Sequence, residues 1–157
     1  MERGKRGCTV SEQNKSIARK LLEEVYSQGK LELLNDIVAP DCRLHDPVFP
    51  SLEPGINNLK KHVAMIRKGF PDIRFQCDDV LAERDEVVIH WTASGTHRET
   101  FLGMGATNRA ATVSGTSIYR IEKGKIGEMW SDWNLLTLLS QLGLATIPEM
   151  QTKSARA

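Results

Sequence analysis

The feature of this sequence that most constrains its fold is a change in hydrophobic period after Phe70-Pro71-Asp72. Before this point, apolar residues recur at the spacing of amphipathic helices, which predicts helices over 11–28 and 55–69 with a short helix between them. After it, apolar and polar residues alternate, as they do in strands. The predicted strands are 73–82, 86–97, 111–121 and 125–133, followed by a last helix over 135–142. This order indicates an α+β fold, in which N-terminal helices cover one face of a strongly curved antiparallel or mixed sheet and leave a pocket.

Composition limits the class of protein. The chain has 157 residues, of which 40% are hydrophobic, and this is the size of one domain with a substantial core. We expect that domain to cover 11–144, with flexible tails at 1–10 and 145–157. A net charge of +1 without a basic stripe argues against a nucleic-acid partner.

Three kinds of motif are absent from the sequence, and each absence excludes a class of partner or site. No run approaches the roughly 20 apolar residues that a membrane span needs, so we expect no membrane partner. Cys8, Cys42 and Cys77 form neither a disulfide framework nor a zinc-binding spacing, which fits a reducing cytoplasm. No metal-ligand spacing and no phosphate-binding glycine loop occurs, so we predict no metal and no cofactor.

The last predicted strand carries polar and aromatic residues on one face. Alternation places Glu128, Trp130, Asp132 and Asn134 on the same side of the sheet. Because a buried carboxylate or amide is costly unless it is paired, a face used only for packing would rarely collect these groups. We therefore predict that this face lines the pocket.

Structural explanations stay open for each of these residues. A strand carboxylate such as Asp132 is more often solvated or paired than catalytic. His97 at a strand end fits a loop hydrogen bond, His45-Asp46-Pro47 fits an Asx turn, and His90 fits a cross-strand partner. Spacing alone also predicts that His62, which follows Lys60 and Lys61 on a helix, is a solvated side chain.

Short motifs along the chain carry a family resemblance. They are Asn35 to Asp41, His45-Asp46-Pro47, Gly55, Phe70-Pro71-Asp72, Gly95-Thr96-His97, Phe101-Leu102-Gly103, Gly124-Lys125-Ile126, Glu128, Trp130 and Gln141-Leu142-Gly143. Their order and spacing over 14–143 resemble the SnoaL-like polyketide cyclases, also called ester cyclases, of the nuclear transport factor 2-like superfamily. The resemblance implies a cone-shaped half-barrel.

The resemblance also implies a reaction. Family cyclases close a ring by an intramolecular aldol condensation without a cofactor, using an acid/base carboxylate in an apolar pocket. Asn134 stands where the family pattern has its aspartate, and an amide cannot act as that base. We therefore predict Asp132 as the acid/base residue, with His97 and Asn134 as hydrogen-bonding partners of a substrate oxygen.

The remaining expectations concern the ligand and the assembly. The predicted binding residues for a hydrophobic small molecule are Trp130, Glu128, His90, His45, Trp91 and Phe101. Glu128 also fits a structural partner of Arg120 or His90. The replaced aspartate favours, as an alternative, a pocket protein that binds a ligand without catalysis. Apolar residues on both faces of the strands, together with the resemblance, predict a homodimer through the outer faces of the sheets.

Overall fold

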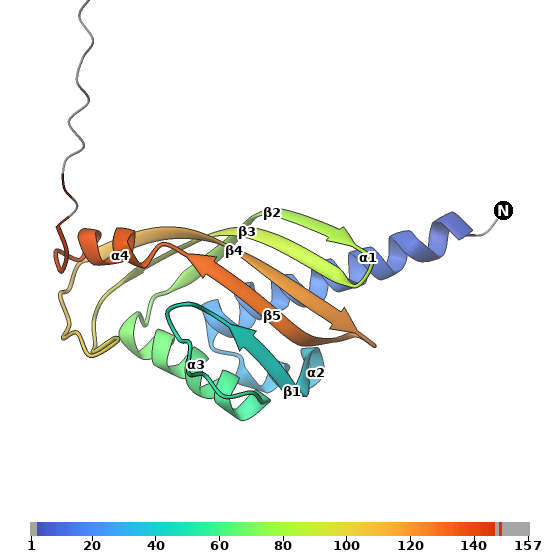
Figure 1. The fold of residues 1–157 in the computed structure, drawn as a ribbon, viewed down its shortest axis with the longest axis horizontal. Helices are drawn as coiled ribbons and strands as arrows, with labels where there is room; N and C mark the ends of the chain where they lie inside the picture. Colours follow the sequence, from blue (N-terminus) through green and yellow to red (C-terminus); the bar gives the residue numbers. More distant parts are fainter. Residues whose placement is uncertain (1–2, 147, 149–157) are drawn as a thin grey trace, which may run out of the picture.

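The computed structural model describes residues 3–146 and residue 148, and it confirms the α+β prediction. Apart from one strand, the elements up to residue 69 are helical, and four strands and a last helix follow (Figure 1). The α-helices are α1 (Arg3–Lys20), α2 (Leu34–Ile37), α3 (Ile56–Gly69) and α4 (Leu135–Gln141). The strands are β1 (Val38–His45), β2 (Arg74–Glu83), β3 (Glu86–Thr96), β4 (Ala110–Glu122) and β5 (Lys125–Trp133).

One curved sheet holds all five described strands in the order β1-β5-β4-β3-β2. Neighbouring strands from β2 to β5 pair antiparallel, as predicted, whereas β1 pairs parallel with β5. Hydrophobic alternation did not identify β1, because Pro40 and a register shift between Val38 and Arg43 interrupt its pattern. Proline and irregular pairing are tolerated there because β1 is an edge strand.

The helices cover the inner face of the sheet, as the sequence predicted. Helix α1 continues into a π-helical turn, Leu21–Tyr26, which packs on β2, and α3 packs on β1. The turn buries four side chains, namely Leu21, Leu22, Val25 and Tyr26. A π-helical turn holds an extra residue, and such turns are frequent at functional sites.

Helix α1 begins at Arg3, ahead of the predicted start at Ser11. The expected N-terminal tail therefore belongs in large part to this helix. Periodicity gave no signal there because the sequence over 3–10 has too few apolar residues to form a helical stripe. Of the expected C-terminal tail, residues 147 and 149–157 lie outside the described residues. Among the described helices, none is both long and apolar enough to span a bilayer.

Candidate functional site

A cavity lies between the inner face of the sheet and the helices. Its volume is about 100 Å³, and most of its wall is aliphatic or aromatic. Its polar side chains are few and include Tyr26, Asp46, His62, Ser117 and Ser131. Apolar walls with a few convergent polar groups are typical of small-molecule sites.

The inner face of β5 carries Met129, Ser131 and Trp133, all of which line the cavity. Of the opposite face, which was predicted to line the cavity, only Trp130 borders it, and Glu128, Asp132 and Asn134 do not. Each face of β5 carries one tryptophan, so alternation could not tell which one turns inward. The cost of burying charge determines which face turns inward. With Met129, Ser131 and Trp133 inside, no carboxylate of β5 is buried and its acidic side chains stay near water.

Asp132, the predicted acid/base residue, is exposed and does not line the cavity. It lines a more open groove of about 440 Å³, which shares Leu44, Asp46, Phe49 and Trp130 with the cavity wall. Trp130 borders both the cavity and this groove. Its indole ring stacks on His45 with a centroid distance of 5.3 Å, and the Arg120 guanidinium lies 5.0 Å from its centroid. Trp130 thus belongs to a surface cluster, in which Arg120 makes a cation–π contact.

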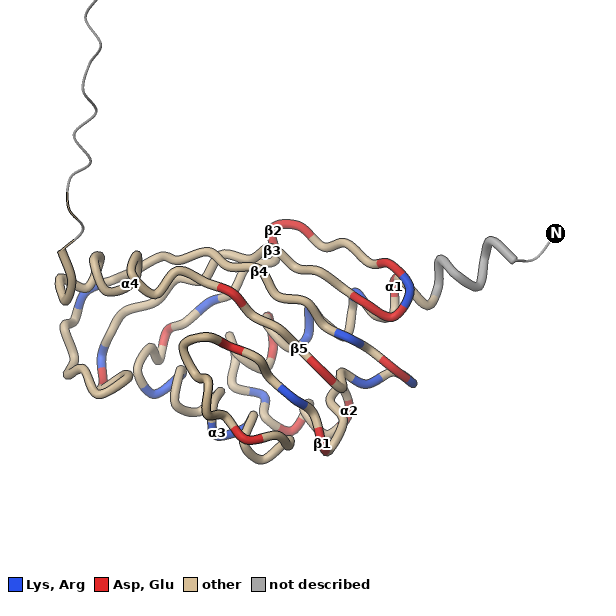
Figure 2. The backbone as a smooth tube through the Cα atoms, viewed as in Figure 1, with Lys and Arg blue, Asp and Glu red and all other residues tan. Residues whose placement is uncertain are grey.

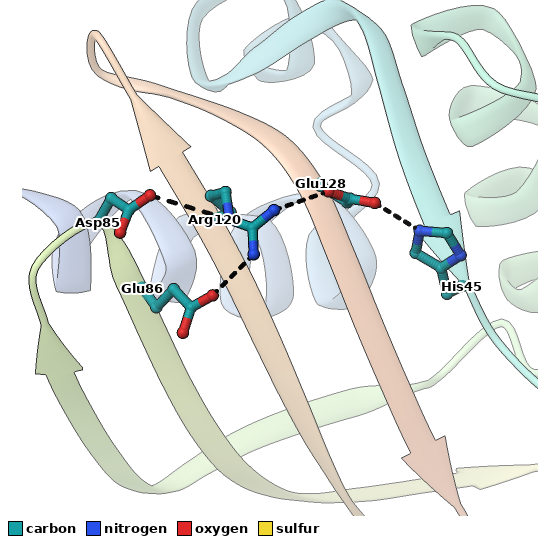
Figure 3. A network of polar contacts seen from close by, with 5 residues as sticks. All are labelled: His45, Asp85, Glu86, Arg120 and Glu128. Carbon is teal, nitrogen blue, oxygen red and sulfur yellow. Dashed lines mark hydrogen bonds and ion pairs between the residues drawn. The ribbon is translucent and has the colours of Figure 1, made fainter.

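The same outer face carries a row of paired charges across the sheet (Figure 3). Arg120 donates to Glu86 and to Glu128, each at 3.0 Å, and the other oxygen of Glu128 lies 2.8 Å from His45 Nε2. Figure 2 shows acidic and basic positions interspersed along β5 and around the neighbouring strands of the sheet. The interpretation of Glu128 as a partner of Arg120 is confirmed, and His45 joins it outside the cavity.

Asn134 caps helix α4. Its Oδ1 accepts a hydrogen bond of 3.0 Å from the backbone N–H of Thr137. Asn and Asp are about equally good at this position, so the aspartate that the resemblance implies here would cap the helix as well. Asn134 is not among the described cavity-lining residues.

The structure divides the other predicted residues. Trp91 and Phe101 line the cavity, and Trp91 Nε1 donates to Ser117 Oγ at 2.9 Å. His97 is fully buried, stacks on Phe70 at 5.3 Å and is absent from the described cavity wall. His90 is exposed on the opposite face, 3.9 Å from the Asp78 carboxylate. Neither histidine reaches the cavity.

Asp46 is the carboxylate that the cavity does contain. It is 7% exposed, its Oδ1 accepts from the Val48 backbone N–H at 2.8 Å, and its Oδ2 accepts from Trp133 Nε1 at 3.1 Å. Burial raises the pKa of Asp46 above its usual value, against the lowering effect of these hydrogen bonds. The sequence showed Asp46 only as a turn residue, and its inward position depends on the pairing of β1 with β5.

His62 is a second buried polar group of the cavity wall, not the solvated side chain that spacing predicted. Its Nδ1 lies 2.9 Å from the Tyr26 hydroxyl oxygen, and Phe49 meets its ring nearly perpendicularly at 4.7 Å. Burial lowers the pKa of His62 to about 4, so the imidazole is neutral at physiological pH. Its position on α3 faces the cavity, while Lys60 and Lys61 precede it on the helix.

These groups define what the site can do chemically. A carboxylate of raised pKa accepts a proton more readily than a solvated one, and a neutral imidazole can donate or accept a hydrogen bond. Across residues 3–146 and 148, no three His, Cys, Asp or Glu side chains form a group that could hold a metal ion. The residues present support acid/base chemistry on an apolar molecule.

Comparisons with known proteins agree with this geometry. Residues 16–142 match the family model of the SnoaL-like polyketide cyclases. TsrD from Streptomyces laurentii has a similar structure, with 26% identity, a TM-score of 0.78 and coverage of 85% of this chain and 97% of that one. No curated protein matches the chain significantly in sequence.

Two further solved structures are those of proposed polyketide cyclases. IdmH from Streptomyces antibioticus is 28% identical, with a TM-score of 0.74 and coverage of 83% of this chain and 99% of that one. The protein from Acidithiobacillus ferrooxidans is 29% identical, with a TM-score of 0.76 and coverage of 87% and 99%. The fold, the apolar cavity and the family match lead to one conclusion: this chain belongs to the SnoaL-like polyketide cyclase family.

Proposed function

We propose that the protein is a cofactor-independent cyclase that closes a ring in a polyketide-like or other hydrophobic carbonyl compound by an intramolecular aldol reaction. The observation that carries the proposal is the Asp46 carboxylate, buried in an apolar cavity between two neutral hydrogen-bond donors. Membership of the family supports the reaction class. Asp46 takes the role that the sequence assigned to Asp132.

In the proposed reaction Asp46 is both the base that removes a proton and the acid that returns it. The carboxylate removes a proton from the carbon next to a ketone, and the electrons of the C–H bond form an enolate. The enolate carbon attacks a second carbonyl carbon of the same molecule, which forms the ring and an alkoxide. Protonated Asp46 then returns its proton to the alkoxide. Val48 N–H and Trp133 Nε1–H hold the carboxylate in place throughout.

One observation favours the alternative of a ligand-binding protein without catalysis. A cavity of about 100 Å³ is small beside the roughly 300–1,000 Å³ of usual ligand sites. A molecule of several fused rings would enter only if a wall residue such as Phe49, in the segment between β1 and α3, moved aside. A small apolar molecule needs no such movement.

A small aryl diketone distinguishes the two functions. We propose 2-acetylphenylacetone, incubated with the protein in D₂O. Deuterium uptake next to its carbonyls is followed by NMR. Ring closure is followed by the fluorescence of the naphthol that forms when the aldol product loses water and tautomerises. Catalysis predicts both signals with the wild type and the loss of both with Asp46→Asn. Asp132→Asn is the matched control, because its carboxylate does not line the cavity and acts on Asp46 only as a neighbouring charge that helps to raise the pKa of Asp46. Binding without deuterium uptake would instead support the pocket protein.

A homodimer in the cytoplasm stays a prediction. The apolar residues that the sequence offered for the outer interface, such as Val87, Ile89 and Tyr119, are buried inside the fold. The outer face still exposes apolar side chains, among them Leu81, Val88, Ile118 and Trp130, which neighbour one another across the strands. Sedimentation at micromolar concentration is expected to show a dimer, and a monomer would contradict this part of the proposal.

A further inference from the structure

The Nε2 atom of His62 lacks a partner inside the cavity wall. His62 is 4% exposed, and its Nε2 is one of two buried side-chain nitrogen or oxygen atoms, among the described residues, without a hydrogen bond. A buried polar group without a partner is uncommon in a folded protein and calls for an explanation. A ligand atom in the cavity would supply the missing partner.

The contact with Tyr26 determines which nitrogen of His62 carries the proton. If the Tyr26 hydroxyl donates to Nδ1, the proton of the neutral imidazole is on Nε2. In the opposite arrangement Nδ1–H donates to Tyr26, and the phenolic hydrogen then has no acceptor among the described residues. That arrangement leaves both the Tyr26 hydroxyl hydrogen and His62 Nε2 without a partner among these residues, whereas the first leaves only Nε2–H without one. The first is therefore favoured, and it makes Nε2–H a donor.

We infer that the Nε2–H of His62 donates a hydrogen bond to the substrate oxygen on which negative charge develops when Asp46 removes a proton. The inference rests on the proposed function, since it assigns a second residue to the same reaction. His62 forms and breaks no covalent bond: it stabilises the enolate and later the alkoxide as a fixed donor in a site of low polarity. Tyr26 is a positioning residue that fixes the tautomer.

His97 provides a matched control within the same molecule. It is also a buried histidine whose Nε2 has no partner, and its Nδ1 lies 3.2 Å from a hydroxyl oxygen, that of Thr107. The difference is location, because His62 lines the cavity and His97 is absent from its described wall. Any effect that requires a ligand in the cavity should therefore distinguish the two residues.

The tautomer can be tested on the free protein. In ¹⁵N NMR spectra at neutral pH, His62 Nε2 is expected to show the shift of a protonated ring nitrogen and Nδ1 that of a hydrogen-bonded acceptor. Tyr26→Phe should move both shifts toward the average of two tautomers. A proton on Nδ1 in the wild type would overturn the inference, whether or not the protein is an enzyme.

Hydrogen-bond donation can be tested with a bound ketone. The probe is acetophenone with a ¹³C-labelled carbonyl, a single-ring ketone whose C=O stretching frequency falls when the oxygen accepts a hydrogen bond. Relative to the wild type, His62→Phe should raise this frequency and weaken binding about tenfold, the effect of losing one hydrogen bond. His62→Gln, whose side chain keeps both an acceptor and an N–H donor, should restore part of both. His97→Gln should behave as the wild type.

The outcomes separate this inference from the proposed function. An equal frequency and affinity in the wild type and His62→Phe would overturn the role of His62, even if Asp46→Asn still lost deuterium uptake. Conversely, a frequency shift that depends on His62 but no deuterium uptake would support the donor and refute catalysis. An effect of His97→Gln as large as that of His62→Phe would trace both to folding and overturn the inference.

Discussion

Two carboxylates beside the β1–β5 pair lie on opposite faces of the sheet and differ in every partner. Asp46 faces the cavity, is buried and accepts from two neutral donors, Val48 N–H and Trp133 Nε1–H. Glu128 faces outward, is partly exposed and pairs with Arg120 and His45. Burial makes the first a candidate base, whereas a cation and water make the second a structural group. The face of the sheet, not the residue type, determines the chemistry available to each.

The largest effect should separate the inner face from the outer in catalysis. We expect Asp46→Asn to lower the rate of deuterium uptake by the aryl diketone about 100-fold or more, because the amide cannot take a proton. Asp132→Asn should leave the rate near that of the wild type. The reverse order of the two variants would restore Asp132 as the acid/base residue and refute the assignment made from the inner face.

The next effect concerns stability in acid. The pKa of His62 is lowered from 6.5 to about 4 in the fold, so the unfolded chain takes up this proton first as the pH falls. The stabilisation is complete above pH 6.5 and is lost as the pH falls to about 4, with a total loss of about 3 kcal/mol. Chemical denaturation at several pH values should show a flatter acid slope for His62→Phe.

The exposed His90 provides the control for this measurement. His90→Gln should keep the wild-type dependence of stability on pH, because its side chain lies on the outer face near water. If His62→Phe and the wild type lost stability in parallel between pH 6.5 and 4, the burial of a neutral His62 would not explain the acid sensitivity.

A smaller effect tests the packing of the inner face. A Cβ at Gly115 would lie 2.8 Å from the Asp132 carbonyl oxygen and would meet the ring of Trp91, whereas a Cβ at Gly127 would meet nothing within 4 Å. Gly115→Ala should therefore reduce the free energy of unfolding by about 2 kcal/mol. Gly127→Ala should change it little. Equal melting temperatures for the two variants would contradict the close contact.

The smallest effect is expected on the outer face. Glu128→Gln removes the charge that pairs with Arg120, whose side chain is 39% exposed. Solvated ion pairs contribute little, so the loss in unfolding free energy should stay below about 1 kcal/mol and should shrink further in high salt. A loss well above this, unaffected by salt, would mean that the outer cluster is part of the core.

How far the sequence predicted the molecule varies between its parts. The strands from β2 to β5 and the last helix follow their predicted bounds closely, because a hydrophobic pattern of period two and strong turn residues are local signals. The predicted site residues do not form one cluster. Trp91, Phe101 and Trp130 line the cavity, whereas His45 and Asp132 line the groove that Trp130 also borders. On β5 the face of Glu128, Trp130 and Asp132 showed the clearer alternation of polar and aromatic residues, but the face of Met129, Ser131 and Trp133 packs inward.

Patterns read along the chain were enough to predict the fold class, the family and the order of the elements other than β1. Tertiary packing was needed to show which face of β5 is inside and that Asp46 and His62 are the titratable groups, besides Tyr26 and Tyr119, that line the cavity. Asp46 turns inward because β1 pairs parallel with β5, and His62 meets Tyr26, 36 residues earlier, because two helical segments converge on the sheet. Contacts between distant segments leave no period in the sequence, so the chemistry of the site became visible only when the chain was folded.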